Sequence, residues 1–242
     1  MKKHLLIMLA LIFIMSGCGS AQLGYEITGD NQFIIQNYLQ FDTQTLDAGG
    51  RELLADTVEY WRSLGFTIYP GITENEVGGR LHLQANSSRH LEALVESNLT
   101  GARGPFSSAQ FRRSGTWLYE QYSLDLAIDL GNFFDDDSLS ELPEREREFL
   151  SEIASRLDEM DMEVQFTLPG RYTAGNAELV ESPSESSTTL TWSLTPGYNQ
   201  LQATTRVWIV SPLLAGGVII GVSLLIAAII FGAVKKRKQS VR

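Results

Sequence analysis

The sequence of 242 residues contains one cysteine, Cys18, so no disulfide can form within the chain. Lysine is missing from residues 19–211, because all five lysines lie in the two terminal segments. The same stretch carries 12 arginines against 29 acidic residues, which gives it a net charge of −17. Such a surface repels nucleic acids at long range, so we expect no nucleic-acid partner.

Histidine is scarce as well, and after the first few residues it occurs only at His82 and His90. The chain has no zinc-protease motif, nucleophile elbow or phosphate-binding loop. We therefore expect a protein that is not an enzyme, with no catalytic residue and no cofactor. The run Asp135 to Asp137 lacks the alternating ligands and central glycine of a calcium loop, so we expect no metal site either.

The amino-terminal segment has the features of a signal peptide, predicted here over residues 1–17. Lys2 and Lys3 precede an apolar run of eleven residues, Leu5 to Met15, which is shorter than the roughly 20 residues that cross a bilayer. The sequence Met15-Ser16-Gly17-Cys18 resembles a bacterial lipobox. The resemblance implies cleavage before Cys18 and acylation of its thiol, for example with palmitate. An ordinary signal peptide with an incidental cysteine is the alternative.

The carboxy-terminal segment is apolar over 22 uncharged residues, Leu213 to Val234. At 1.5 Å per residue this run reaches about 33 Å, which predicts one transmembrane helix within residues 207–234. The basic residues that follow predict a cytoplasmic tail, 235–242, and leave the domain 18–206 outside the cell membrane. Gly217 and Gly221 form a GxxxG pattern, by which such helices pair, so a homo-oligomer is one possible assembly.

The segment between the two ends combines strand and helix periodicity. Apolar and polar residues alternate over 81–85, 124–130, 162–168 and 190–194, and "TWSLTPGYNQLQATTR" is typical of two strands joined by a short turn. Helical spacing occurs over 50–65, 87–101 and 143–160, with Gly65 as a left-handed stop for the first helix and a serine as N-cap of the second. We therefore predict an α+β domain, in which about three helices cover one face of an antiparallel sheet.

The whole layout resembles the LppM-type lipoproteins of the bacterial envelope, most clearly at Leu168-Pro169-Gly170 and from Thr191 to Arg206. The resemblance implies an extracytoplasmic α+β domain that binds an envelope lipid or glycolipid. The negative charge of the domain opposes recognition of acidic headgroups and favours contacts with acyl chains or sugars.

Three residues are candidates for ligand binding. Arg112 and Arg113 could hold a phosphate or sugar headgroup through paired hydrogen bonds, although a salt bridge within this acidic domain is the alternative. Trp192 lies on an apolar strand face that could line an acyl-chain cavity between sheet and helices, unless these side chains fill a dry core. The rival function is a non-catalytic structural or assembly module of the envelope.

Overall fold

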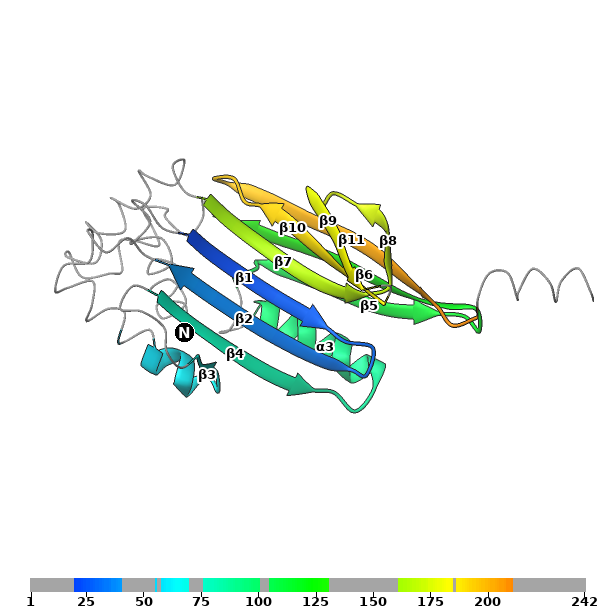
Figure 1. Ribbon diagram of the computed structural model, residues 1–242, viewed down its shortest axis with the longest axis horizontal. Coiled ribbons are helices and arrows are strands. Elements are labelled where there is room, and N and C mark those ends of the chain that lie inside the picture. Colours follow the sequence, from blue (N-terminus) through cyan, green and yellow to red (C-terminus); the bar gives the residue numbers. More distant parts are fainter. Residues whose placement is uncertain are drawn as a thin grey trace, which may run out of the picture.

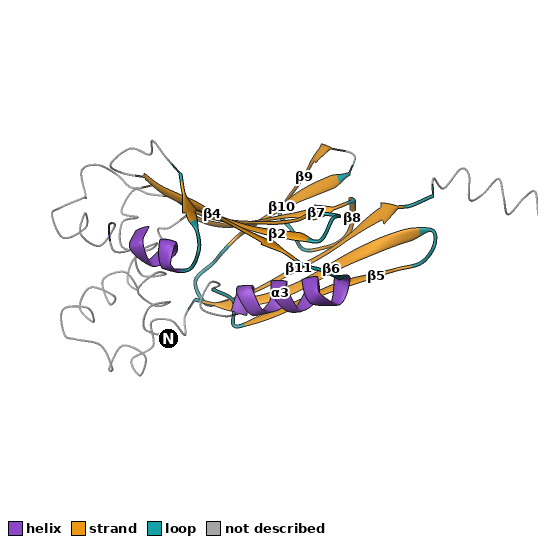
Figure 2. Cartoon of the chain, turned by 90° about the horizontal axis from the view of Figure 1, so that it is seen from below, coloured by secondary structure: helices purple, strands orange, loops and turns teal. Residues whose placement is uncertain are grey.

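The computed structural model of the chain describes residues 20–40, 55, 58–69, 76–100, 105–130, 161–184 and 186–210. Within these ranges eleven strands form a seven-stranded sheet and a four-stranded sheet that lie one above the other (Figures 1 and 2). The seven-stranded sheet has the order β3 (Thr67–Ile68), β4 (Glu76–Gln84), β2 (Gln32–Gln40), β1 (Ser20–Ile27), β7 (Asp161–Pro169), β10 (Ser187–Ser193) and β9 (Leu179–Ser184). The four-stranded sheet has the order β5 (Ser108–Gly115), β6 (Tyr119–Asp129), β11 (Tyr198–Trp208) and β8 (Arg171–Gly175).

Neighbouring strands are antiparallel in both sheets, except that β1 and β7 run parallel. The helix α3 (Ser88–Thr100) lies beside β5, in the layer of the four-stranded sheet (Figure 2). Two of its carboxylates accept hydrogen bonds from backbone N–H groups of β5: Glu96 from Phe111 at 3.1 Å and Glu92 from Arg113 at 2.7 Å. The helix therefore protects a strand edge that would otherwise present unpaired backbone groups.

The core lies between the two sheets and is made by the alternation of their strands. Tyr25, Phe33 and Phe166 pack ring against ring on the inner face of the seven-stranded sheet, and the rings of Trp192 and Phe166 meet edge to face. The opposing layer contributes fully or nearly fully buried side chains from β5, β6 and α3: Phe111, Tyr122, Leu124, Leu126, Leu91, Val95 and Leu99. Buried side chains therefore fill the space between the sheets, which agrees with the dry core that was the alternative to an acyl-chain cavity.

The chain changes sheet at Gly170, where β7 ends and β8 begins. Gly170 has a φ of 87°, and a Cβ at this position would lie 2.4 Å from the backbone carbonyl of Arg206. Two buried threonines hold the corner through short hydrogen bonds, Thr188 to the Gly170 carbonyl and Thr205 to the Pro169 carbonyl, both 2.6 Å long. Only a residue without a side chain fits here, because β11 passes directly against the turn.

The predicted class, an α+β domain with helices on one face of an antiparallel sheet, is wrong. The described part is mostly β, has two sheets, and contains one parallel strand pair. The reason is that much of the chain between the predicted elements also forms strands, and that the turns at Gly170 and Gly197 connect different sheets. The strands within "TWSLTPGYNQLQATTR", β10 and β11, form as predicted but belong to different sheets.

The predicted helices have different outcomes. The helix over 87–101 is confirmed as α3, and its N-cap is Ser87, whose hydroxyl accepts a hydrogen bond from the His90 backbone. Of the helix over 50–65, residues 58–63 are helical, and Gly65 has the expected positive φ of 91°. The predicted helix 143–160 and the apolar run 213–234 lie outside the described residues. In the ranges that are described, no helix has the length and apolarity needed to cross a membrane.

Candidate functional site

A pocket of about 300 Å³ opens on the outer face of the four-stranded sheet, the face turned away from the core. Alternation along the strands creates this polar face. On β6, Leu124 and Leu126 point into the core, so Ser123 and Asp125 point outward. All four strands of the sheet contribute to the lining, which consists of Gln110, Arg112, Ser123, Leu124, Asp125, Ala174, Gly175, Gln202, Ala203 and Thr204.

The register of the strands fixes which side chains face one another across the pocket. Arg112 on β5 is paired with Ser123 on β6, which in turn is paired with Thr204 on β11. Two residues further along β6, on the same face of the sheet, Asp125 is paired with Gln110 on β5 and with Gln202 on β11. The pocket therefore presents two adjacent rows of polar groups from neighbouring strands.

The carboxylate of Asp125 is held by two amides from β11. Gln200 donates to one of its oxygens at 3.2 Å, and Gln202 donates to the other at 3.1 Å. Arg112 is exposed and makes no ion pair with any other described residue. The pocket thus combines an oriented acceptor with a guanidinium whose five N–H donors are available.

The β8 side of the pocket is positioned by Gly175 and Asn176. A Cβ on Gly175 would lie 2.2 Å from the carbonyl oxygen of Gln202, so this residue lets β8 lie directly against β11. The Asn176 amide then continues the strand pairing, donating to the Gln200 carbonyl at 2.7 Å and accepting from the Gln202 N–H at 2.7 Å. Its side-chain oxygen also accepts from the indole N–H of Trp192 at 3.0 Å.

Trp192 is therefore a buried core residue that positions the pocket wall and does not line the pocket. Its exposed fraction is 3%, and it contacts Phe166 on one side and Asn176 on the other. No signal in the sequence identifies Asn176 as its partner, since the two residues lie on different segments and meet only through the fold.

The two adjacent arginines have different environments. Arg113 points to the same side of β5 as Phe111, and its guanidinium contacts both oxygens of Glu120 at 3.0 and 2.9 Å. It also donates to the side-chain oxygen of Asn31 and lies over the ring of Tyr122, 5.4 Å from its centroid. Arg113 thus forms the internal salt bridge that was the alternative prediction, whereas Arg112 lines the pocket.

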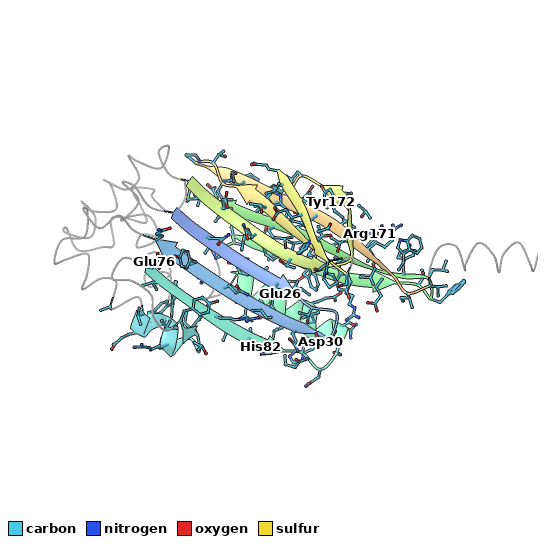
Figure 3. The ribbon with its side chains drawn as sticks, viewed as in Figure 1. Glu26, Asp30, Glu76, His82, Arg171 and Tyr172 are labelled. Carbon is cyan, nitrogen blue, oxygen red and sulfur yellow. The ribbon has the colours of Figure 1, made fainter. Side chains whose placement is uncertain are left out.

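The remaining candidates lie elsewhere. His82 is exposed on β4 of the seven-stranded sheet, on the opposite side of the molecule in Figure 3 from Arg171 and Tyr172 on β8 of the four-stranded sheet. His90 lies in the first turn of α3, where its Nδ1 accepts from the Asn86 backbone at 3.4 Å. Asp135 to Asp137, Cys18, Gly217 and Gly221 lie outside the described residues. Within the described ranges, no group of three or more His, Cys, Asp or Glu side chains is arranged to hold a metal ion.

Comparison with known proteins assigns the chain to a family. Residues 72–238 match the family described as "Protein of unknown function (DUF3153)". The chain belongs to this family. A search of curated proteins finds no match. Among solved structures, the chain is similar to the NMR structure of the folded domain of LppM from Mycobacterium tuberculosis. The TM-score is 0.40 at 12% sequence identity, and the match covers 78% of this chain and 90% of the LppM domain. At this TM-score the similarity is weak, and the resemblance to LppM-type lipoproteins stays a prediction.

Proposed function

We propose that this member of the DUF3153 family is an acylated lipoprotein of the bacterial envelope whose β domain binds the sugar-containing headgroup of an envelope glycolipid. Binding is non-catalytic, and it takes place in the pocket on the outer face of the four-stranded sheet. The observation that carries the proposal is this pocket, which has the guanidinium of Arg112 in one register row and the oriented carboxylate of Asp125 in the next. Acylation of Cys18 is inferred from the lipobox-like sequence 15–18.

The chemistry of the lining suits sugar hydroxyls. A hydroxyl both donates and accepts, and the pocket offers donors from Arg112, an acceptor at Asp125, and hydroxyl or amide groups that do both. A phosphate suits the pocket less well, because the Asp125 carboxylate would repel it. The overall charge of the domain opposes anionic ligands in the same way.

The position of the pocket favours a headgroup over an acyl chain as the bound part. Large apolar side chains occupy the space between the sheets, and the pocket lies on the solvent side of one of them. Binding of an acyl chain between the layers would require these buried side chains to move apart, at the cost of contacts in a closely packed interior.

The proposal is tested by purifying the full chain from its own membrane and identifying co-purified lipids by mass spectrometry. Thr204→Trp should fill the pocket and lower the amount of bound glycolipid, and Arg112→Ala should lower it as well. Arg80→Ala is the matched control, because it removes a half-exposed arginine from the other sheet. Equal lipid recovery from all four proteins would exclude the pocket as the binding site.

Acylation is tested separately by labelling cells with a fatty-acid probe. We expect label on the natural chain and none on Cys18→Ser. Equal labelling of both would remove the lipoprotein part of the proposal without touching the pocket.

An assembly module is the second candidate, and the edge strand β9 favours it. All six residues of β9 are exposed, including Leu179 at 51% and Val180 at 39%, and no described strand pairs with its outer edge. Glu181 and Pro183 on the same strand oppose further pairing, so we rank this function second. Chemical cross-links that form in the natural protein and are lost in Leu179→Lys would favour the assembly function.

A further inference from the structure

One end of the four-stranded sheet carries three exposed apolar side chains, Trp117, Trp208 and Ile209. With the half-buried Tyr119 and Arg206 beside them they form a surface that we call the aromatic tip. The exposed fractions are 68% for Trp117, 44% for Trp208 and 56% for Ile209. Trp117 lies in the turn between β5 and β6, and the other residues lie at the start of β6 and the end of β11.

Backbone and side-chain contacts hold the tip together as one surface. Tyr119 and Trp208 are register partners, and their rings meet edge to face at 5.6 Å. The Leu118 carbonyl accepts hydrogen bonds from the N–H groups of Ile209 and Val210, at 2.9 and 3.2 Å. The Arg206 guanidinium lies 4.4 Å from the centroid of the Tyr119 ring and 5.8 Å from that of Trp208. Such contacts stabilise a cation over aromatic rings.

The tip differs from the rest of the domain in charge and in apolar exposure. Residues 114–119 and 206–210 contain a single charged side chain, the cation Arg206, although the domain as a whole is strongly acidic. The other two tryptophans of the chain, Trp61 and Trp192, are buried with exposed fractions of 0% and 3%. Both exposed tryptophans of the protein therefore lie at the same end of the same sheet.

We propose that the aromatic tip docks onto the surface of a lipid bilayer. Tryptophan, tyrosine and arginine are common at the boundary between lipid headgroups and acyl chains. Each of these side chains has an apolar part that contacts the acyl chains and a polar group that contacts the headgroups. The chain also leaves the described part of the structure from this tip, at Val210, and the uncharged residues 213–234 follow. A lipid surface fits the tip better than an acidic protein surface of the kind this domain itself presents, because the exposed side chains are mostly apolar.

Docking at the tip would bring the pocket close to the membrane. Trp208 and the pocket residue Thr204 point to the same side of β11 and lie four residues apart, which corresponds to about 13 Å along a strand. The inference rests on the membrane location in the proposed function, and it is independent of the pocket's ligand and of Cys18 acylation.

The test uses the intrinsic fluorescence of the full chain reconstituted into vesicles of phosphatidylcholine and phosphatidylglycerol. Lipids brominated on their acyl chains quench only tryptophans that reach the bilayer. We expect brominated vesicles to quench the natural protein, and we expect the quenching to be lost in the double variant Trp117→Phe/Trp208→Phe. Aqueous iodide should quench the natural protein weakly once vesicles are present.

A matched control adds a tryptophan on the far side of the molecule. In the double-variant background, His82→Trp on the outer face of β4 should be quenched by iodide and not by brominated lipid. Quenching of Trp117 and Trp208 by iodide alone would overturn the proposal. Protection of both from iodide and from brominated lipid would also overturn it, in favour of a second copy of the chain covering the tip. Failure of the chain to float with vesicles would instead refute the membrane location.

Discussion

Arg112 and Arg113 are neighbours in the sequence with opposite surroundings, and this contrast gives a sharp test of the structure. We consider Arg113→Met and Arg112→Met, which keep much of the apolar stem and remove the guanidinium. Loss of the Arg113 guanidinium deprives Glu120 of a two-pronged ion pair, Asn31 of a donor and the Tyr122 ring of a cation. Loss of the Arg112 guanidinium breaks no ion pair with another described residue.

The size of the effect follows from the burial of the pair. Removing one member of a fully buried ion pair costs about 3–5 kcal/mol, because the other charge stays buried without a partner. The side chains of Arg113 and Glu120 are 14% and 33% exposed, so water screens part of the penalty. We expect Arg113→Met to lower the free energy of unfolding by about 2–3 kcal/mol, and Arg112→Met to change it by less than about 0.5 kcal/mol.

The measurement is urea unfolding of the full chain in detergent micelles, followed by the fluorescence of the buried tryptophans. A double-mutant cycle with Glu120→Gln should show a coupling between Glu120 and Arg113 and none between Glu120 and Arg112. Similar unfolding midpoints for the two arginine variants would refute the assignment of Arg113 to the interior and Arg112 to the pocket.

Two further predictions concern the corner and the core. Gly170→Ala should destabilise the domain by more than the roughly 1–3 kcal/mol that a strained backbone conformation alone costs, because it combines a positive φ with a backbone clash. Gly29→Ala is the near-neutral control in the same unfolding assay, because Gly29 has open space around it. Burial raises the pKa of Tyr122 to about 12 from its usual 10, so the folded state prefers the neutral ring. Its contribution to stability is complete below pH 10 and is lost as the pH rises towards 12. The free energy of unfolding should therefore fall less steeply with pH in Tyr122→Phe than in the natural protein across that interval.

The sequence predicts local structure well where the alternation is strong. The strands β4, β6, β7, β10 and β11 and the helix α3 all lie where apolar residues recur with period two or with helical spacing. The pattern does not predict the strand β9, because all of its residues are exposed and its sequence "LVESPS" therefore has no buried face. Edge strands of this kind are defined by their neighbour and not by their own pattern.

The two-sheet architecture could not be predicted because the signals at its corners are local and ambiguous. Pro169-Gly170 and Pro196-Gly197 are typical of turns, and a turn that returns to the same sheet has the same sequence signature as one that crosses to another. What decides at Gly170 is the backbone of Arg206, a residue far along the chain. The parallel pairing of β1 with β7 likewise joins distant segments and leaves no short-range trace.

The candidate site was predictable in one respect. Since Phe111 is apolar and expected to point inward, alternation along β5 places Arg113 on the inner side and Arg112 on the outer side. The partners of Arg112 across the pocket were not predictable, because they depend on which strands lie side by side. Trp192 shows the same limit: its burial follows from the pattern, but its hydrogen bond to Asn176 does not.

The two proposed membrane contacts lie at opposite ends of the domain. Cys18 precedes the first residue of β1 by two positions, which corresponds to a reach of at most about 7 Å. The start of β1 lies beside the start of β7, whereas the end of β7 lies against β11 near the aromatic tip (Figure 1). If both ends contact one membrane, the long axis of the domain must lie along the bilayer surface and one sheet face must turn towards the lipid.

The proposed ligand decides which face that is, if the headgroup in the pocket belongs to a lipid of the same membrane. We therefore expect the outer face of the four-stranded sheet to turn towards the bilayer and the outer face of the seven-stranded sheet to turn away. Reporters at Ser108 on β5, outside the pocket lining, and Gln36 on β2 distinguish the two faces. In the Trp117→Phe/Trp208→Phe background, Ser108→Trp should be protected from iodide by vesicles, and Gln36→Trp should remain open to it. Equal quenching at both positions would mean that the domain stands upright on a single end.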